Sequence, residues 1–410
     1  MTDFTLINIG ELLQVEESPH LLRGEDLATL PSIKDAYLEV SNGIITGYGK
    51  MSQMKGNPVN PKDVSGRLVF PAFVDSHTHL VFAQPREQEF VQKIKGATYQ
   101  EIAASGGGIL NSARRLQEMS EDELFDRSLV RAHQIMHQGT GTVEIKSGYG
   151  LTTQDELKML RVAKRISDNT PLTVKTTFLG AHAVPKDTSK ESYIDLVINE
   201  MIPRVAEENL ATFIDIFCEE GFFTEEESVK ILEKGKEYGL IPKVHANQLS
   251  LSGGTQAGIA TNAISVDHLE TISDVEIDLL KNSDTIGTTL PGAAFYLRVS
   301  YPPARQLINS NVAVAVASDF NPGSSPTGNM QTIWSLATIG MKMTPVEALN
   351  GMTVNGAFAM EAEGESGVIK TGRKADLIIS KKVPSLEYIP YSFGEDCIEQ
   401  VILNGEFIRE

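Results

Sequence analysis

The sequence of 410 residues is poor in cysteine, has no long apolar run and is short of positive charge. Its two cysteines, Cys218 and Cys397, are too few for a disulfide framework or a thiolate zinc site, and they suit a reducing cytoplasm. No apolar run approaches the roughly 20 residues that span a bilayer, and the first residues lack a basic segment followed by an apolar one. We therefore expect a cytoplasmic protein in which any metal is bound by nitrogen and oxygen.

The charge balance limits the partners of the chain. It has 36 Lys and Arg residues against 54 Asp and Glu residues, a formal net charge of -18. This charge opposes binding to phosphate backbones and to anionic membrane surfaces. We therefore expect neither nucleic acid nor a membrane as a partner. An apolar share of 41% allows a substantial core, and the length fits one large barrel with a smaller appendage.

Between about residues 70 and 340, short apolar runs alternate with longer amphipathic ones, which is typical of a parallel sheet covered by helices. The short runs are Leu68–Val74, Thr142–Lys146, Thr173–Leu179, Phe213–Cys218, Pro242–His245, Ala263–Asp267, Thr285–Leu290 and Val312–Ser318. Helices are predicted at Glu121–Gln138, Gln154–Ser167, Glu191–Glu208 and Glu225–Tyr238. Eight strands predict an α/β fold, a closed (β/α)8 TIM-like barrel.

The two ends of the chain have a different pattern, in which β-type runs are separated by Asn-Gly turns. Asn42-Gly43 and Asn404-Gly405 lie inside such runs and predict hairpins. We expect both ends to pair into one small β-sandwich-like domain beside the barrel. The expected boundaries are 1–66 plus 361–410 for this domain and 67–360 for the barrel.

The most informative motif is His77-Thr78-His79, just after the first predicted barrel strand. Side chains two apart on a strand point the same way, so the two imidazoles can share a metal ion. Catalytic groups of such barrels gather at the carboxyl ends of the strands. Polar residues occupy the ends of several other strands: His182, His245, His268 and Asp319.

Three neutral imidazoles and one carboxylate form a suitable set of ligands for zinc or iron and leave room for water. We therefore expect His77, His79, His245 and Asp319 to bind the metal, and His268 to handle protons. His133 and His137 are spaced four apart on a predicted helix, but the Glu of a zinc-protease motif is absent, so they are expected to be structural.

Longer segments carry a resemblance to a known family. They are 71–80 (PAFVDSHTHL), 85–90 (PREQEF), 144–150 (EIKSGYG), 178–182 (FLGAH), 318–323 (SDFNPG) and 372–377 (GRKADL). With these segments the chain resembles the amidohydrolase superfamily and, within it, the imidazolonepropionase family of histidine degradation. The resemblance covers nearly the whole chain and implies a barrel of the metal-dependent hydrolase type.

The resemblance implies hydrolysis of the cyclic amide of 4-imidazolone-5-propanoate to N-formimidoyl-L-glutamate. It also implies one metal ion, because the fourth strand ends in Cys218-Glu219 and lacks the lysine that bridges the metals of binuclear relatives. Asp319 could pass a proton from water to the departing ring nitrogen, and His268 could orient the water and stabilise charge on oxygen.

Further residues are carried over from the family as substrate contacts. Arg86 is expected to bind the propanoate carboxylate, since a guanidinium grips a carboxylate through two parallel hydrogen bonds. Without the resemblance, a surface pair with Glu87 or Glu89 would be the preferred interpretation. The other expected contacts are Tyr149, His182, Gln248, Asn321, Gly323 and Ser324.

Gln248 departs from part of the family, which has glutamate at this position. An amide can hydrogen-bond the substrate ring but cannot carry a proton, so more of the proton transfer is expected from His268 and Asp319.

Two alternatives remain open at this point. The chain could be another cyclic-amide hydrolase or an aminohydrolase on the same scaffold, or a metal-free scaffold protein without catalysis. The expected partners are a small-molecule substrate and a second copy of the chain in a homodimer.

Overall fold

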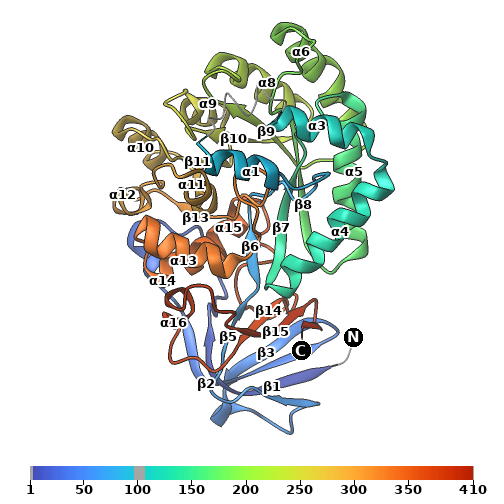
Figure 1. Ribbon diagram of the computed structural model, residues 1–410. Coiled ribbons are helices and arrows are strands. Elements are labelled where there is room, and N and C mark those ends of the chain that lie inside the picture. Colours follow the sequence, from blue (N-terminus) through green and yellow to red (C-terminus); the bar gives the residue numbers. More distant parts are fainter. Residues whose placement is uncertain (1–2, 97–106, 410) are drawn as a thin grey trace.

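The computed structural model describes residues 3–96 and 107–409, and it consists of a helix-covered barrel above a sheet built from both ends of the chain (Figure 1). Eight parallel strands form the barrel in sequence order. They are β6 (Phe73–Asp75), β7 (Thr140–Lys146), β8 (Thr173–Ala181), β9 (Phe213–Cys218), β10 (Ile241–Ala246), β11 (Ser265–His268), β12 (Ile286–Thr289) and β13 (Val314–Val316). Beyond the ends of β6 and β13, a parallel bridge between Thr78 and Phe320 joins the first and last strands.

Helices surround the barrel, as the alternating pattern predicts (Figure 1). Ser120, Thr152 and Thr224 cap the N-termini of α4 (Glu121–His137), α5 (Thr153–Asn169) and α8 (Glu225–Glu237). Each side chain accepts a hydrogen bond from a main-chain N–H of the first turn. The helices of the barrel are α1 (Glu87–Ile94), α3 (Ile109–Glu118), α4 (Glu121–His137), α5 (Thr153–Asn169), α6 (Lys190–Leu196), α7 (Ile202–Glu207), α8 (Glu225–Glu237), α9 (Gly254–Thr261), α10 (Asp274–Lys281), α11 (Pro291–Leu297), α12 (Ala304–Asn309), α13 (Met330–Met341), α14 (Pro345–Gly351) and α15 (Val354–Phe358). A π-helical turn at Val197–Met201 joins α6 to α7, so the helix predicted at Glu191–Glu208 is one interrupted run.

The predicted extent of the first barrel strand is wrong. Leu68–Val74 was expected to be a single barrel strand, but it divides into β5 (Leu68–Pro71) and β6. β5 pairs with strands of the terminal sheet, whereas β6 pairs with β7. At the junction, the N–H of Ala72 donates to Asp376 O and the N–H of Phe73 donates to Gly139 O, so consecutive residues pair with different sheets. A continuous apolar run cannot reveal this change of partner.

The terminal sheet joins both ends of the chain, as expected, in the order β16-β15-β14-β5-β1-β2-β3, with β4 paired to β1. Its elements are β1 (Phe4–Leu13), β2 (Ser32–Ser41), β3 (Ile44–Lys50), β4 (Pro61–Asp63), β14 (Leu377–Ser380), β15 (Ile398–Leu403) and β16 (Glu406–Arg409), with short helices η1 (Gly24–Ala28), η2 (Met51–Gln53) and α16 (Tyr388–Tyr391) nearby. The domain boundaries given above stay a prediction.

Both Asn-Gly pairs form hairpin turns of the terminal sheet. Asn42 and Gly43 have φ of 51° and 79°, and Asn404 and Gly405 have φ of 51° and 74°. These values suit turns in which both central residues have positive φ. The two turns touch, since a Cβ at Gly405 would lie 2.4 Å from Gly43 Cα. A larger residue at Gly405 would therefore push the two ends of the chain apart.

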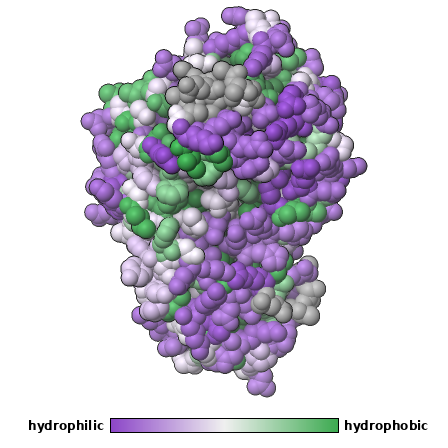
Figure 2. Space-filling view, in the orientation of Figure 1, coloured by the Kyte–Doolittle hydropathy of each residue, from purple (hydrophilic) through white to green (hydrophobic). Residues whose placement is uncertain are grey.

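The visible face of the molecule is mostly hydrophilic, with apolar side chains gathered over α1 (Figure 2). On this helix Phe90, Val91 and Ile94 are exposed. Phe90 also stacks on Tyr296 with 5.3 Å between the ring centroids, which ties α1 to α11. Among the described residues, no helix is both long and apolar enough to cross a membrane.

Candidate metal centre

The four expected ligands come from three separate parts of the barrel and meet at its carboxyl end. His77 and His79 follow β6, His245 is the second-last residue of β10, and Asp319 follows β13. Two main-chain bonds fix the segments around them, because Asp319 N donates to His77 O and His79 N donates to Phe320 O. All four side chains are buried. The closing contact between the first and last strands thus also brings His77 and His79 to Asp319.

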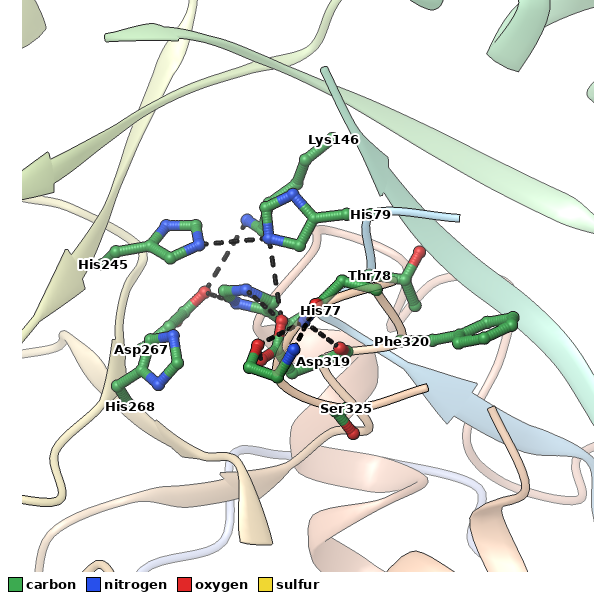
Figure 3. Close-up of polar contacts among 12 residues, drawn as sticks. His77, Thr78, His79, Lys146, His245, Asp267, His268, Asp319, Phe320 and Ser325 are labelled. Atoms are coloured by element: carbon green, nitrogen blue, oxygen red, sulfur yellow. Dashed lines mark hydrogen bonds and ion pairs between the residues drawn. The ribbon is translucent and has the colours of Figure 1, made fainter. Parts of the chain in front are cut away.

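Donor atoms of His77, His79 and His245 lie within 4.8 Å of one another, and Asp319 Oδ1 lies beside two of them (Figure 3). Asp319 Oδ1 is 3.6 Å from His77 Nε2 and 3.7 Å from His79 Nε2, and His79 Nε2 is 3.3 Å from His245 Nε2. Two ligands held tetrahedrally at about 2.1 Å from zinc would lie roughly 3.4 Å apart. Donor atoms of His77, His268 and Asp319 also meet within 4.8 Å, so His268 lies beside this group.

The protonation of His77 supports a cation at this point. Its Nδ1 is 2.7 Å from Asp267 Oδ2 and must be the donor, since an ionised carboxylate only accepts. Burial lowers the pKa of His77 well below the usual range, so the ring is neutral and its Nε2 carries a lone pair. This buried Nε2 has no hydrogen-bond partner among the described residues. A lone pair facing the Asp319 carboxylate is repulsive unless a cation lies between them. The residues present therefore fit a metal ion.

The pKa values of His77 and His79 indicate neutral rings, the form expected of metal ligands, rather than charged imidazolium groups. Burial, and secondarily the neighbouring cations and imidazoles, lower the pKa values of His77 and His79 well below the usual range. Burial raises the pKa of Asp319, although His268 opposes this shift. Neutral imidazoles are the form that binds metals.

His268 has a strained backbone and a carboxylate partner. Its φ of 93° lies in the region that favours glycine, and strain of this kind is concentrated at functional sites. Its Nδ1 is 3.2 Å from Glu270 Oε1. Burial alone would lower the pKa of His268, but Glu270 and Asp319 outweigh burial and raise it. His268 is therefore suited to donate a proton or a hydrogen bond beside the ligands.

Arg86 lies against the loop that follows Asp319. A Cβ at Gly323 would be 1.5 Å from Arg86 Nη2, so only glycine leaves room for this guanidinium. Arg86 Nε is buried without a hydrogen-bond partner among the described residues, and Glu89 Oε2 lies 3.8 Å away. Lys93 Nζ donates to Gly323 O at 3.1 Å and holds α1 to the same loop. The guanidinium thus keeps hydrogen-bonding capacity for an anionic ligand.

Tyr149 and His182 line the site next to His79. The ring of His182 stacks on that of His79 at 5.4 Å, and the Tyr149 ring is 5.7 Å from His79. Burial, and secondarily His245, lower the pKa of His182 to about 3, so its ring is neutral. The buried carboxylate of Glu156 accepts the N–H groups of Gly148, Gly150 and Leu151 and thereby fixes the turn that carries Tyr149.

Asn321 and Ser324 shape the loop after Asp319. Asn321 Oδ1 accepts the N–H groups of Gly323 and Ser324, and its Nδ2 donates to Asp319 O at 2.7 Å. Ser324 Oγ donates to Asp319 Oδ2 at 3.1 Å. The side chain of Asn321 is thus engaged within its own loop, and its expected substrate contact stays a prediction.

Gln248 is half-buried between two anchored neighbours. Asn247 Nδ2 donates to Glu276 Oε1 at 2.7 Å, and the N–H of Leu249 donates to Glu219 Oε2 at 2.9 Å. Glu219, at the end of the fourth barrel strand, therefore holds this loop in position. The role of Gln248 toward the substrate stays a prediction.

A group of charged residues lies beneath the proposed ligands and was not predicted from the sequence. This buried charged layer consists of Glu144, Lys146, Asp215, Lys243 and Asp267. Burial disfavours the ammonium of Lys146, but Asp215 and Glu144 outweigh this effect and raise its pKa. A sequence signal existed, because charged residues alternate with apolar ones inside buried strands, as in Thr142-Val-Glu-Ile-Lys146.

His133 and His137 lie on the exposed face of α4, where His137 Nδ1 pairs with His133 O at 2.7 Å. The structure therefore brings neither of them to the ligand group. The helix covers the barrel, as its pattern predicts.

Comparisons with known proteins give the family. The sequence profile of the amidohydrolase family matches residues 68–408. The chain is 48% identical to the imidazolonepropionase of Flavobacterium johnsoniae, over 98% of this chain and all of that protein, and 48% identical to that of Christiangramia forsetii, over 98% of each. The solved structure of E. coli guanine deaminase superposes with a TM-score of 0.74 at 16% identity, covering both chains completely, which shows the same fold. The chain belongs to the amidohydrolase family and, within it, to the imidazolonepropionases.

Proposed function

We propose that this protein hydrolyses the cyclic amide of 4-imidazolone-5-propanoate to N-formimidoyl-L-glutamate at a single metal ion. The observation that carries the proposal is the pairing of two features at one end of the barrel. Donor atoms of His77, His79, His245 and Asp319 converge there, and the guanidinium of Arg86 lies against the Asp319 loop, its Nε without a hydrogen-bond partner among the described residues. The first feature suits hydrolysis and the second suits a carboxylate-bearing substrate.

His77, His79, His245 and Asp319 would hold the metal, either zinc or iron, because the donors are three nitrogens and one oxygen. When bound, such an ion supplies Lewis acidity, which lowers the pKa of water toward about 7 and polarises a carbonyl oxygen. The absence of a lysine at Cys218-Glu219 supports one ion rather than two.

The residues of the chain divide the remaining work. Asp319 accepts a proton from the attacking water and returns it to the ring nitrogen as the amide C–N bond breaks. His268 orients the water and stabilises the negative charge that grows on the carbonyl oxygen. Arg86 binds the propanoate carboxylate through two parallel hydrogen bonds. Tyr149, His182 and Gln248 contact the ring, and the loop of Asn321, Gly323 and Ser324 contacts the polar groups of the substrate.

The direct test is incubation of the purified protein with 4-imidazolone-5-propanoate. The ultraviolet absorbance of the imidazolone is expected to fall, and mass spectrometry should identify N-formimidoyl-L-glutamate. Turnover of neutral cyclic amides or aminopurines, with no reaction of this substrate, would favour another hydrolase on the same scaffold. A metal content under about a tenth of an equivalent after metal-supplemented expression would favour a non-catalytic scaffold protein.

The proposal includes a cytoplasmic homodimer that binds neither nucleic acid nor membranes. Both cysteines are free and buried, and the net charge is strongly negative. Light scattering after size-exclusion chromatography should give twice the chain mass of 44.7 kDa. A mass of one chain would contradict the dimer without affecting the proposed reaction.

A further inference from the structure

Two carboxylates of the buried charged layer each contact one proposed metal ligand. Asp267 Oδ2 lies 2.7 Å from His77 Nδ1, and Asp215 Oδ2 lies 2.8 Å from His245 Nδ1. Asp215 Oδ1 also accepts the main-chain N–H of His245 at 3.1 Å. Asp267 fixes the proton on His77 Nδ1, so Nε2 of that ring keeps the lone pair that a metal needs. Asp215 holds His245 through the main-chain bond and through the close contact at Nδ1, which is not aligned as a hydrogen bond. The two carboxylates therefore help to orient both rings.

The third histidine is supported differently. His79 Nδ1 is buried without a hydrogen-bond partner among the described residues, and its ring stacks on His182. Ring packing thus holds His79, whereas carboxylates hold His77 and His245. Changes in the charged layer should therefore affect His77 and His245 directly, but not His79.

Lys146 joins the two carboxylates. Its Nζ lies 2.8 Å from Asp215 Oδ2, 2.8 Å from Glu144 Oε1 and 3.7 Å from Asp267 Oδ2. An ammonium has three N–H donors and no acceptor, so a single lysine can serve three carboxylates. The side chain of Lys146 is completely buried and approaches Asp267 from beside the ligand histidines (Figure 3).

Lys243, the other lysine of the layer, makes mainly different contacts. Its Nζ donates to Glu144 Oε2 at 2.8 Å, to Ser76 O at 3.0 Å and to Ala359 O at 3.3 Å, and it lies 3.8 Å from Asp267 Oδ2. It therefore ties the main chain just before His77 to the barrel. Lys146, by contrast, lies within ion-pair distance of both aspartates that support ligands.

We propose that Lys146 is a positioning residue of the metal site, acting through Asp215 and Asp267 to set the affinity of the chain for its metal ion. The inference rests on the single-metal site of the proposed function. Without the Lys146 ammonium, Asp215 would lose its 2.8 Å ion-pair partner, and Asp267 would keep the 3.8 Å contact to Lys243. The two carboxylates would then shift away from the histidines, and both rings would lose orientation.

The test compares the Zn²⁺ dissociation constants of Lys146→Met, Asp215→Asn and Asp267→Asn with that of the wild type, by chelator competition. Each change is expected to weaken zinc binding about 10- to 100-fold, the range typical of partners behind metal ligands, and to leave KM unchanged. Because the residues act in one relay, the Lys146→Met/Asp267→Asn double variant should lose less affinity than the product of the two single losses.

Lys158→Met is the matched control. Lys158 is also buried, pairs with Asp155 at 2.7 Å and donates to Leu116 O and Met119 O, away from the ligands. This variant should lower the melting temperature of the metal-free protein but keep wild-type zinc affinity.

A Lys146→Met protein whose zinc affinity is within about twofold of wild type, or losses that multiply fully in the double variant, would overturn the proposal. If Lys146→Met does not fold, the two Asp→Asn variants decide, and wild-type zinc affinity in both would overturn it. A wild-type chain that binds no zinc or iron would instead count against the proposed function.

Discussion

The barrel and the terminal sheet are both eight-stranded, but they bury different chemistry. The barrel interior holds five charged side chains directly beneath the ligand histidines, whereas the core of the terminal sheet is apolar, with residues such as Leu6, Leu38 and Ile402. Burying a charged side chain costs free energy unless the charge is paired. We therefore expect buried charged side chains where they take part in the chemistry of the site. The difference teaches that changes in the barrel interior should alter chemistry, and changes in the terminal sheet should alter stability alone.

The largest expected effect comes from Asp319→Asn in the barrel. An amide is a poor metal ligand and cannot accept the proton from water, so metal content and turnover should fall together. The loss should exceed the roughly 100-fold upper range typical of residues behind the ligands. Elemental analysis and the absorbance assay would measure both quantities. Asp284→Asn, at an exposed carboxylate paired with Arg23, is the control and should change neither.

His268→Ala should separate proton handling from metal binding. Turnover is expected to fall about 10²- to 10⁴-fold, the range for a positioned acid or base, while metal content stays near normal. His133→Ala, on the exposed face of α4, should behave as the wild type. Loss of metal together with activity in the His268 variant would mean that His268 is a ligand.

Arg86→Ala should affect substrate binding more than turnover. Removing hydrogen bonds to a charged group costs roughly 1.5–3 kcal/mol, so KM should rise about 10- to 150-fold. Arg114→Ala, at an exposed arginine paired with Glu118, is the control. An equal rise in KM for an uncharged analogue of the substrate would contradict carboxylate recognition by Arg86.

Ile402→Ala tests the terminal sheet, where a change should alter stability alone. Ile402 is completely buried in the terminal sheet, and truncating such a residue costs about 2–5 kcal/mol of stability. Denaturant unfolding should show this loss, while kcat and metal content of the folded protein stay unchanged. Ile339→Ala, the same change at a side chain that is 67% exposed, should have little effect on stability. Lower kcat in folded Ile402→Ala protein would break the division between the two regions.

The smallest effect is expected for a charged pair of the terminal sheet. Arg67 Nε and Nη2 lie 2.6 and 2.7 Å from the carboxylate of Glu399, and this bonding lowers the Glu399 pKa. A lowered pKa in the folded state stabilises the protein above the unfolded value of about 4.3 and is lost as pH falls through the folded value. Glu399→Gln should therefore cost about 0.2–1 kcal/mol at pH 7 and nothing near pH 2. A cost that persists at low pH would assign the effect to packing.

Much of the barrel could be predicted from local pattern. Strands β7 to β13 and helices such as α4 and α8 follow from alternating runs. The metal ligands were proposed from residues at strand ends, and that assignment stays a prediction. The division of Leu68–Val74 could not be predicted, because it depends on hydrogen bonds to Asp376 and Gly139, which are distant in sequence.

The charged residues that contact the proposed ligands could not be predicted either, because these contacts join residues that are distant in sequence. Asp267 directly precedes His268, yet it bonds to His77 across the barrel, 190 residues earlier. Lys146 and Asp215 lie within strands, where sequence alone does not show which face is shared. The register of parallel strands decides which charged residues meet, and that register is a property of the closed barrel.

The most direct measurement is an anomalous difference map at the zinc or iron absorption edge from crystals of the metal-loaded protein. We expect one peak per chain, about 2.0–2.2 Å from His77 Nε2, His79 Nε2, His245 Nε2 and an Asp319 oxygen. A peak elsewhere, or one from which any of these four atoms is absent, would contradict the account.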